Sequence, residues 1–145
     1  MYTCKRITTA ETYLVRHPVL RKGKPIESCA FNGDDLHSTQ HFGLFDADRL
    51  IGVLSLFVEK CDLFETETQL QFRGMAVLES EQNKGIGVQL MQFAESQITV
   101  PSPYLIWLNA REKAISFYKK MGYQSIGEPF TIGDIGTHFV YYKTR

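Results

Sequence analysis

Paired cysteines, an excess of either charge and long apolar runs are all missing from this 145-residue sequence. The cysteines are Cys4, Cys29 and Cys61, an odd number without C-x-x-C spacing, so neither a disulfide framework nor a metal site is predicted. Sixteen basic residues balance sixteen acidic ones, so no overall field draws the chain to nucleic acid. Because no apolar run approaches the roughly 18 residues of a membrane span, we expect a cytoplasmic protein with no membrane partner.

What is present is an ordinary globular composition, 43% hydrophobic and 22% charged, at a length that fits one domain over residues 1–145. Alternating or continuous apolar runs indicate strands. These strands are predicted at residues 3–7, 41–45, 50–58, 68–77, 104–108, 123–127 and 138–142. The polar turn 46–49 joins two of them as a hairpin, and 104–108 suits a buried parallel strand.

The first helix is predicted to begin after Thr8, which forms a capping box with Glu11. Pro18 marks either a break in this helix or a second start. Its predicted apolar stripe consists of Leu14, Val15 and Val19. The turn-rich segment 21–35 follows, and it is either a wall of a substrate site or a solvated connector.

The most informative stretch is the polar turn between Val77 and Gly87. It joins a strand to a helix whose apolar positions recur every three or four residues. That stripe consists of Ile86, Leu90, Phe93, Ala94 and Ile98. Gly85 and Gly87 allow an anion to approach the free N–H groups at the helix start. The turn lacks the Gly-Lys-Ser/Thr of a P-loop and the third glycine of a Rossmann fingerprint, and a glycine turn without a ligand stays open.

Two motifs identify a family. Gln82-Asn83-Lys84-Gly85-Ile86-Gly87 resembles the Gln/Arg-x-x-Gly-x-Gly/Ala loop of the GNAT N-acetyltransferases, and the run from Leu108 to Tyr123 resembles their strand–helix segment with Ala-x-x-Phe-Tyr. The resemblance extends over the chain and is specific between about residues 70 and 123, closest to small bacterial members of unassigned substrate. It implies acetyl-CoA as acyl donor, with its diphosphate held by residues Gln82 to Gly87.

The resemblance also implies further contacts with the cofactor. The backbone of Met75, Ala76 and Val77 would pair with the pantetheine arm where the strand splays, and the Val77 N–H would stabilise the oxyanion. Phe117 and Tyr118 match the family's aromatic pair. Asn109 would bond the pantetheine arm or orient Tyr118, although it also reads as a simple helix cap.

The chemistry requires a proton donor for the departing thiolate. Tyr118 suits this role because a tyrosine with a pKa of about 10 stays protonated at neutral pH and can donate to a thiolate. It could equally be a core aromatic residue on a helical stripe. Its match to the acid tyrosine of the family favours the catalytic reading.

The general base is less clear. Gln71 stands where many lysine-acetylating members carry glutamate, and glutamine cannot take a proton. Arg73 on the same strand face could bind an acidic group of the acceptor or could simply be solvated. A further polar group could supply a base or, less readily, a metal site, although no metal is expected. This group consists of Asp34, Asp35, His37 and His41.

Together these observations predict a mixed α/β (α+β) fold with a mostly antiparallel sheet, flanking helices and one parallel pair splayed at the cofactor site. The predicted function is acetyl transfer from acetyl-CoA to a small-molecule or peptide primary amine by direct attack in a ternary complex, with a small or amino-acid-like amine favoured as acceptor. A non-catalytic acyl-CoA-binding module is the alternative, and an adaptor for peptide or nucleic acid ranks last. The resemblance also allows a homodimer through the last strands.

Overall fold

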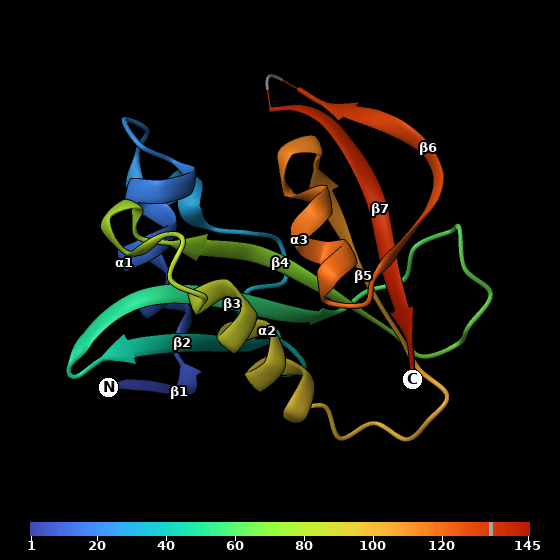
Figure 1. Ribbon diagram of the computed structural model, residues 1–145, viewed down its shortest axis with the longest axis horizontal. Helices are drawn as coiled ribbons and strands as arrows, with labels where there is room; N and C mark the ends of the chain where they lie inside the picture. The colour runs from blue at the N-terminus through green and yellow to red at the C-terminus, as the bar shows by residue number, and fades with distance from the viewer. Residues whose placement is uncertain (134) are drawn as a thin grey trace. The chain divides into compact units, whose positions relative to one another are not determined.

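A computed structural model describes residues 1–133 and 135–145 of the chain (Figure 1). The described residues group into two compact units, the first formed by residues 1–57 and 73–99 and the second by 58–72 and 100–145. Within the described residues, seven strands form a sheet in the order β1-β2-β3-β4-β5-β7-β6. β4 and β5 are parallel, whereas β1–β2, β2–β3, β5–β7 and β6–β7 are antiparallel pairs. The predicted mixed fold is therefore confirmed.

The strands are β1 (Tyr2–Ile7), β2 (Gln40–Asp46), β3 (Arg49–Val58), β4 (Gln69–Val77), β5 (Leu105–Arg111), β6 (Gln124–Ile132) and β7 (Gly136–Thr144). The helices are α1 (Thr9–Leu20), α2 (Ile86–Ser96) and α3 (Ile115–Lys120), with short 3₁₀ turns at Ile26–Cys29, Glu79–Glu81 and Glu112–Ala114. None of the helices in the described part of the chain is long and apolar enough to cross a membrane.

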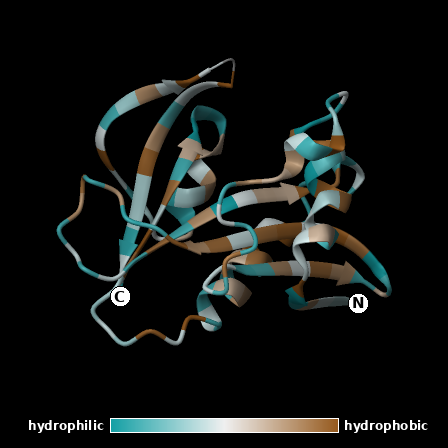
Figure 2. Ribbon diagram, turned by 180° about the vertical axis from the view of Figure 1, so that it is seen from behind, coloured by the Kyte–Doolittle hydropathy of each residue, from teal (hydrophilic) through white to brown (hydrophobic). Residues whose placement is uncertain are grey.

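In the first unit, α1 and α2 pack on opposite faces of the strands. Val15 of α1 belongs to the same buried cluster as Val53 of β3. Gly52, the preceding residue of β3, faces the other way, and a Cβ built there would lie 3.0 Å from side-chain atoms of Ile86 and Leu90 in α2. The strong hydrophobic colour of β3 in Figure 2 reflects this coverage of both faces.

The start of α1 is as predicted, but its buried face is not. Glu11 N donates to Thr8 Oγ1 at 3.2 Å and Thr8 N donates to the Glu11 carboxylate at 2.8 Å, which completes the capping box. Pro18 lies inside the helix and does not end it. The predicted stripe is wrong at Leu14, which is 65% exposed, and Arg16 is fully buried instead.

In the second unit, β5, β7 and β6 form an antiparallel ladder. One face carries the buried residues Leu105, Trp107 and Val140, and the segment after β3 covers it. Trp107 Nε1 donates to the Glu59 carbonyl at 2.9 Å, and the rings of Phe64 and Tyr142 lie 5.1 Å apart. These contacts fix the sheet face on which Leu105, Trp107 and the other alternate side chains of β5 lie.

The sequence placed the end of β5 too early. Asn109 was expected to cap a helix, but it lies inside β5, exposed and opposite Val140 of β7. The N-cap residue of the 3₁₀ turn after β5 is instead Arg111, whose side chain makes no capping hydrogen bond. The other end of the helical segment is capped by Gly122, which has φ +93° and whose N–H donates to the Lys119 carbonyl at 3.0 Å.

Candidate active site

The predicted diphosphate turn is an exposed loop that ends at an uncapped helix. Asn83 and Gly85 have positive φ values of 65° and 79°, and Gly85 is the N-cap residue of α2 without a side-chain hydrogen bond. The first bond of the helix runs from Gln89 N to the Gly85 carbonyl at 3.2 Å. The preceding N–H groups, including those of Ile86 and Gly87, therefore have no partner within the helix. This end of an 11-residue helix offers donors and a positive dipole to an anion.

Side chains of the loop hold its shape. Gln82 Nε2 donates to the Val77 carbonyl at 3.0 Å, which ties the loop to the end of β4. Glu81 lies between two cations, with Lys84 Nζ at 3.2 Å and Arg49 Nη1 at 3.5 Å from its carboxylate oxygens. The glutamine of the motif therefore organises the backbone, and Lys84 stands beside the helix start with half of its side-chain surface exposed (51%).

The strand before the loop has an irregular backbone. The register of β4 with β5 runs over three pairs, from Gln69 to Gln71. Further along, Gly74 has φ +70°, and a Cβ built on it would lie 2.9 Å from the Phe31 ring. The segment Met75–Val77 follows, with Ala76 buried and its two neighbours partly exposed. The parallel pairing is thus short, and glycine is required where Phe31 approaches the strand.

Tyr118, the predicted proton donor, lies on α3 in the second unit. Its ring is 5.1 Å from the ring of Phe117 and 6.3 Å from that of Tyr123. Burial raises the pKa of Tyr118 to about 12, while the nearby positive charge of Arg111 acts in the opposite direction. The hydroxyl therefore stays protonated at neutral pH and can act as an acid but not as a base.

The structure places the predicted acceptor residues in different units. Gln71 is buried in the short parallel pairing, directly opposite Trp107. The guanidinium carbon of Arg73 lies 4.8 Å from the centre of the Phe31 ring and 5.2 Å from that of Phe57. Arg73 is thus positioned by two aromatic faces and is not a loosely solvated side chain.

A buried polar network that the sequence did not predict joins α1 to the segment 21–39. The guanidinium of Arg16 donates to both carboxylate oxygens of Asp34, at 2.7 and 3.0 Å, and to the Cys29 carbonyl at 2.9 Å. It also lies 3.9 Å from the centre of the Phe31 ring. Asp34 in turn accepts from the Phe31 N–H at 2.8 Å, so this ion pair fixes the path of the segment.

The network extends to His41, and its hydrogen bonds define the tautomer. Arg16 Nη2 donates to Ser55 Oγ at 2.9 Å, which leaves the Ser55 hydroxyl proton for His41 Nδ1 at 2.6 Å. The protonated Nε2 then donates to the Asp34 carbonyl at 2.9 Å. Burial lowers the pKa of His41 below 6.5, and the charge of Arg16 acts in the same direction.

This pKa shift predicts a loss of stability on acidification. Because the folded pKa of His41 is below the unfolded value of about 6.5, the unfolded chain binds the proton first as the pH falls. The contribution of His41 to stability is therefore complete above pH 6.5 and decreases below it, by up to about 1.4 kcal/mol per pH unit. Urea unfolding at pH 7.5 and 5.5 should show a smaller difference for His41→Gln than for the wild type. The control His37→Gln removes an exposed histidine and should keep the wild-type difference, whereas equal differences in all three proteins would contradict this account.

The network also includes two of the residues that the sequence offered as alternative general bases. Both carboxylate oxygens of Asp34 are bound to Arg16, and both ring nitrogens of His41 are within hydrogen-bonding distance of protein oxygens. Asp35 and His37 are exposed. Nowhere in residues 1–133 and 135–145 do His, Cys, Asp and Glu side chains gather in a group that could hold a metal. The structure thus gives Asp34 and His41 structural roles.

The described residues thus combine a mixed sheet that has a short parallel pair with a glycine-containing turn at the start of α2. The model of the GNAT acetyltransferase domain matches residues 37–125. The uncharacterized N-acetyltransferase YitI of Bacillus subtilis (strain 168) is 34% identical over 144 residues, 99% of this chain and 97% of YitI.

Solved structures agree with this fold. Escherichia coli ElaA superposes with a TM-score of 0.75 at 18% identity over 99% of both chains. An aminoglycoside 6'-N-acetyltransferase complexed with coenzyme A gives a TM-score of 0.75 at 13% identity, over 98% of this chain and 96% of that one. The chain belongs to the GNAT acetyltransferase family. It is accordingly an acyltransferase.

Proposed function

We propose that this protein transfers the acetyl group of acetyl-CoA to a primary amine, which attacks the thioester directly in a ternary complex. The observation that carries the proposal is the exposed, uncapped start of α2 at Gly85, which supplies donors for the cofactor diphosphate. Loop residues Gln82 to Gly87 would hold the diphosphate, and the backbone of Met75 to Val77 would hold the pantetheine arm. The reaction would take place in the cytoplasm, where acetyl-CoA is available.

The catalytic roles follow the chemistry of the described side chains. Tyr118 would donate its proton to the departing thiolate, since its raised pKa keeps the hydroxyl protonated. The Val77 N–H, on the strand end that Gln82 ties to the loop, would donate to the oxyanion. Phe117 would pack beside the thiol end of the cofactor. Asn109 is exposed on β5 and does not cap a helix, so its proposed role is contact with the pantetheine arm.

The nature of the amine follows from the missing base. Because Gln71 cannot accept a proton, an acceptor that is already partly neutral is favoured. An α-amino group with a pKa of about 7.7–8.0 is far more often neutral at pH 7.5 than a lysine side chain with a pKa of about 10.4. The acceptor is therefore proposed to be a small molecule or peptide with an α-amino group or a similarly weakly basic amine.

Thiol release from acetyl-CoA across a panel of amines tests this proposal. The sharpest pair is the carboxamides of Nε-acetyl-lysine and Nα-acetyl-lysine, which expose a peptide-like α-amino group and an ε-amino group on the same skeleton. We expect at least about tenfold faster turnover of the first at pH 7.5, from its larger neutral fraction. Cofactor binding without turnover of any amine would instead favour the non-catalytic acyl-CoA-binding module.

A further inference from the structure

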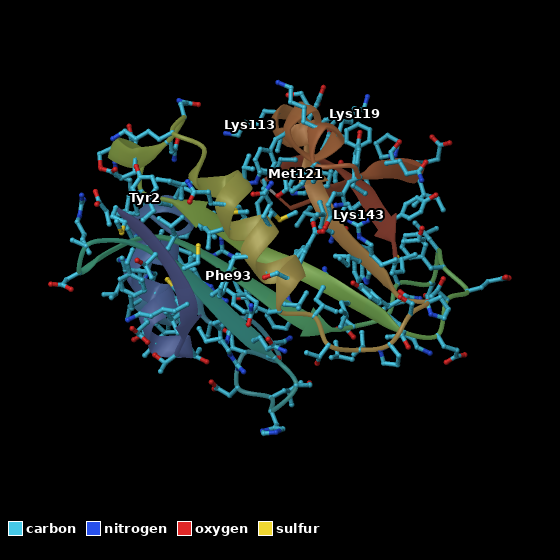
Figure 3. The ribbon with its side chains drawn as sticks, turned by 60° about the horizontal axis from the view of Figure 1, so that its bottom comes forward. Tyr2, Phe93, Lys113, Lys119, Met121 and Lys143 are labelled. Carbon is cyan, nitrogen blue, oxygen red and sulfur yellow. The ribbon has the colours of Figure 1, made fainter. Side chains whose placement is uncertain are left out.

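A cavity in the second unit lies where β5 ends and β7 begins. Its volume is about 330 Å³, near the lower end of the range for small-ligand sites. All of its lining residues belong to the second unit. They are Arg111, Glu112, Lys113, Ile135, Gly136 and Thr137. Lys113, just before α3, is labelled in Figure 3. Two cations, one acid, a hydroxyl and an apolar side chain therefore surround a small space.

Arg111 is the unusual member of this lining. Its side chain is partly buried, yet among the described residues neither a hydrogen bond nor an ion pair engages its guanidinium. By contrast, Arg16 is bound to Asp34, and Arg21 donates to the Ser28 carbonyl at 3.1 Å. Partial burial of a cation that no described acid engages costs free energy, and an anionic ligand would offset that cost.

The neighbours of Arg111 across the sheet do not supply the missing anion. Its partner on β7 is His138, which is buried and packs against the ring of Phe130. His138 Nδ1 lies 2.9 Å from the Gly136 carbonyl, which can only accept, so this nitrogen carries the proton. The ladder thus presents Arg111 to the cavity without pairing it to an acid.

We infer that this cavity binds an anionic group, such as a carboxylate, of the amine acceptor, with Arg111 as its main contact and Lys113 as a second cation. The inference rests on the proposed function and narrows its substrate class to amines that carry a negative charge. Ile135, 45% exposed, offers an apolar contact for a short aliphatic stem, and the Thr137 hydroxyl offers a further donor. The charge of Arg111 also reaches Tyr118, so the cavity lies within electrostatic range of the proposed acid.

Matched acceptors test the inference. The α-amide of glutamate is compared with that of glutamine, and the α-amide of aspartate with that of asparagine. The two members of each pair have nearly the same shape and the same kind of amine but differ by one charge. For the wild type we expect kcat/KM to be at least about tenfold higher for the acidic member of one pair, the gain typical of a charge-assisted hydrogen bond. Arg111→Gln should reduce this ratio to within twofold. Arg6→Gln, which removes an exposed positive charge in the first unit, should leave the ratio unchanged.

Two outcomes separate the inference from the proposed function. If both members of each pair react equally well and Arg111→Gln changes neither ratio, the inference is wrong and the proposed function stands. If no amine reacts, the proposed function fails, and an NMR titration with glutarate and with uncharged glutaramide decides the binding claim alone. Glutarate should shift the amides of Gly136 and Thr137 in the wild type but not in Arg111→Gln. The absence of these shifts in the wild type would overturn the assignment of the cavity.

Discussion

The Tyr118→Phe variant should turn over acetyl-CoA about 100-fold more slowly than the wild type while it binds CoA with the same affinity. The change removes only the hydroxyl, and the ring contacts with Phe117 and Tyr123 are retained. A positioned general acid typically contributes a factor of about 10²–10⁴ to the rate. Burial raises the pKa of Tyr118 to about 12, so its ionisation should not cause a fall in rate below about pH 10.

A matched control separates the loss of the proton donor from the loss of a tyrosine in general. Tyr142→Phe removes a hydroxyl from β7 in the same unit, on a ring that packs against Phe64. We expect its kcat to be within twofold of the wild type. If Tyr118→Phe retained full kcat with an acceptor that the wild type acetylates, another group would have to supply the proton.

The second large effect concerns stability. Asp34→Asn should lower the free energy of unfolding by about 3–5 kcal/mol, the cost of removing one partner of a buried ion pair. Arg16, whose side chain has no exposed surface, would be left without a counter-charge. Urea unfolding monitored by circular dichroism measures this loss. Because the same ion pair fixes the segment 21–39, the variant should also expose that segment to proteolysis.

Exposed pairs give the reference for this prediction. Glu67→Gln removes one partner of the ion pair with Lys60, which has a similar length of 2.9 Å but is 60% and 90% exposed on its two side chains. We expect little or no change, because solvent screens an exposed pair. Replacing both Arg16 and Asp34 with apolar residues should recover part of the loss, because no unpaired charge is then left. Equal small losses for Asp34→Asn and Glu67→Gln would show that the buried pair is not a strong stabilising feature.

Local signals in the sequence were reliable where one short segment decides the structure. The capping box of Thr8 and Glu11 and the C-terminal Gly122 depend on residues a few positions apart, so both could be predicted. The turn from Gln82 to Gly87 could also be predicted, because the glycine at position 85 permits the positive φ that the backbone adopts there.

Features that depend on distant residues could not be predicted in this way. The burial of Arg16 depends on Asp34 and Ser55, which are 18 and 39 positions away, and nothing in the α1 pattern reveals it. β5 continues through the exposed Asn109 because pairing with β7 satisfies the backbone hydrogen-bonding groups, whichever side chain stands at this position. Arg111 could not be singled out from the sequence, because the cavity beside it is formed partly by Ile135, Gly136 and Thr137, which are distant from it along the chain.

The most direct test of the cofactor site is a calorimetric titration of CoA into three proteins: the wild type, Gly85→Val and Gly23→Val. The two glycines have nearly equal φ values of 79° and 77°, and a built Cβ has no atom within 4 Å at either, so valine strains the backbone similarly in both. If the start of α2 holds the diphosphate, the wild type and Gly23→Val will bind CoA equally well and Gly85→Val will bind at least about tenfold more weakly. Equal affinity in all three proteins, or no binding by the wild type, would contradict the assignment of this loop to the cofactor.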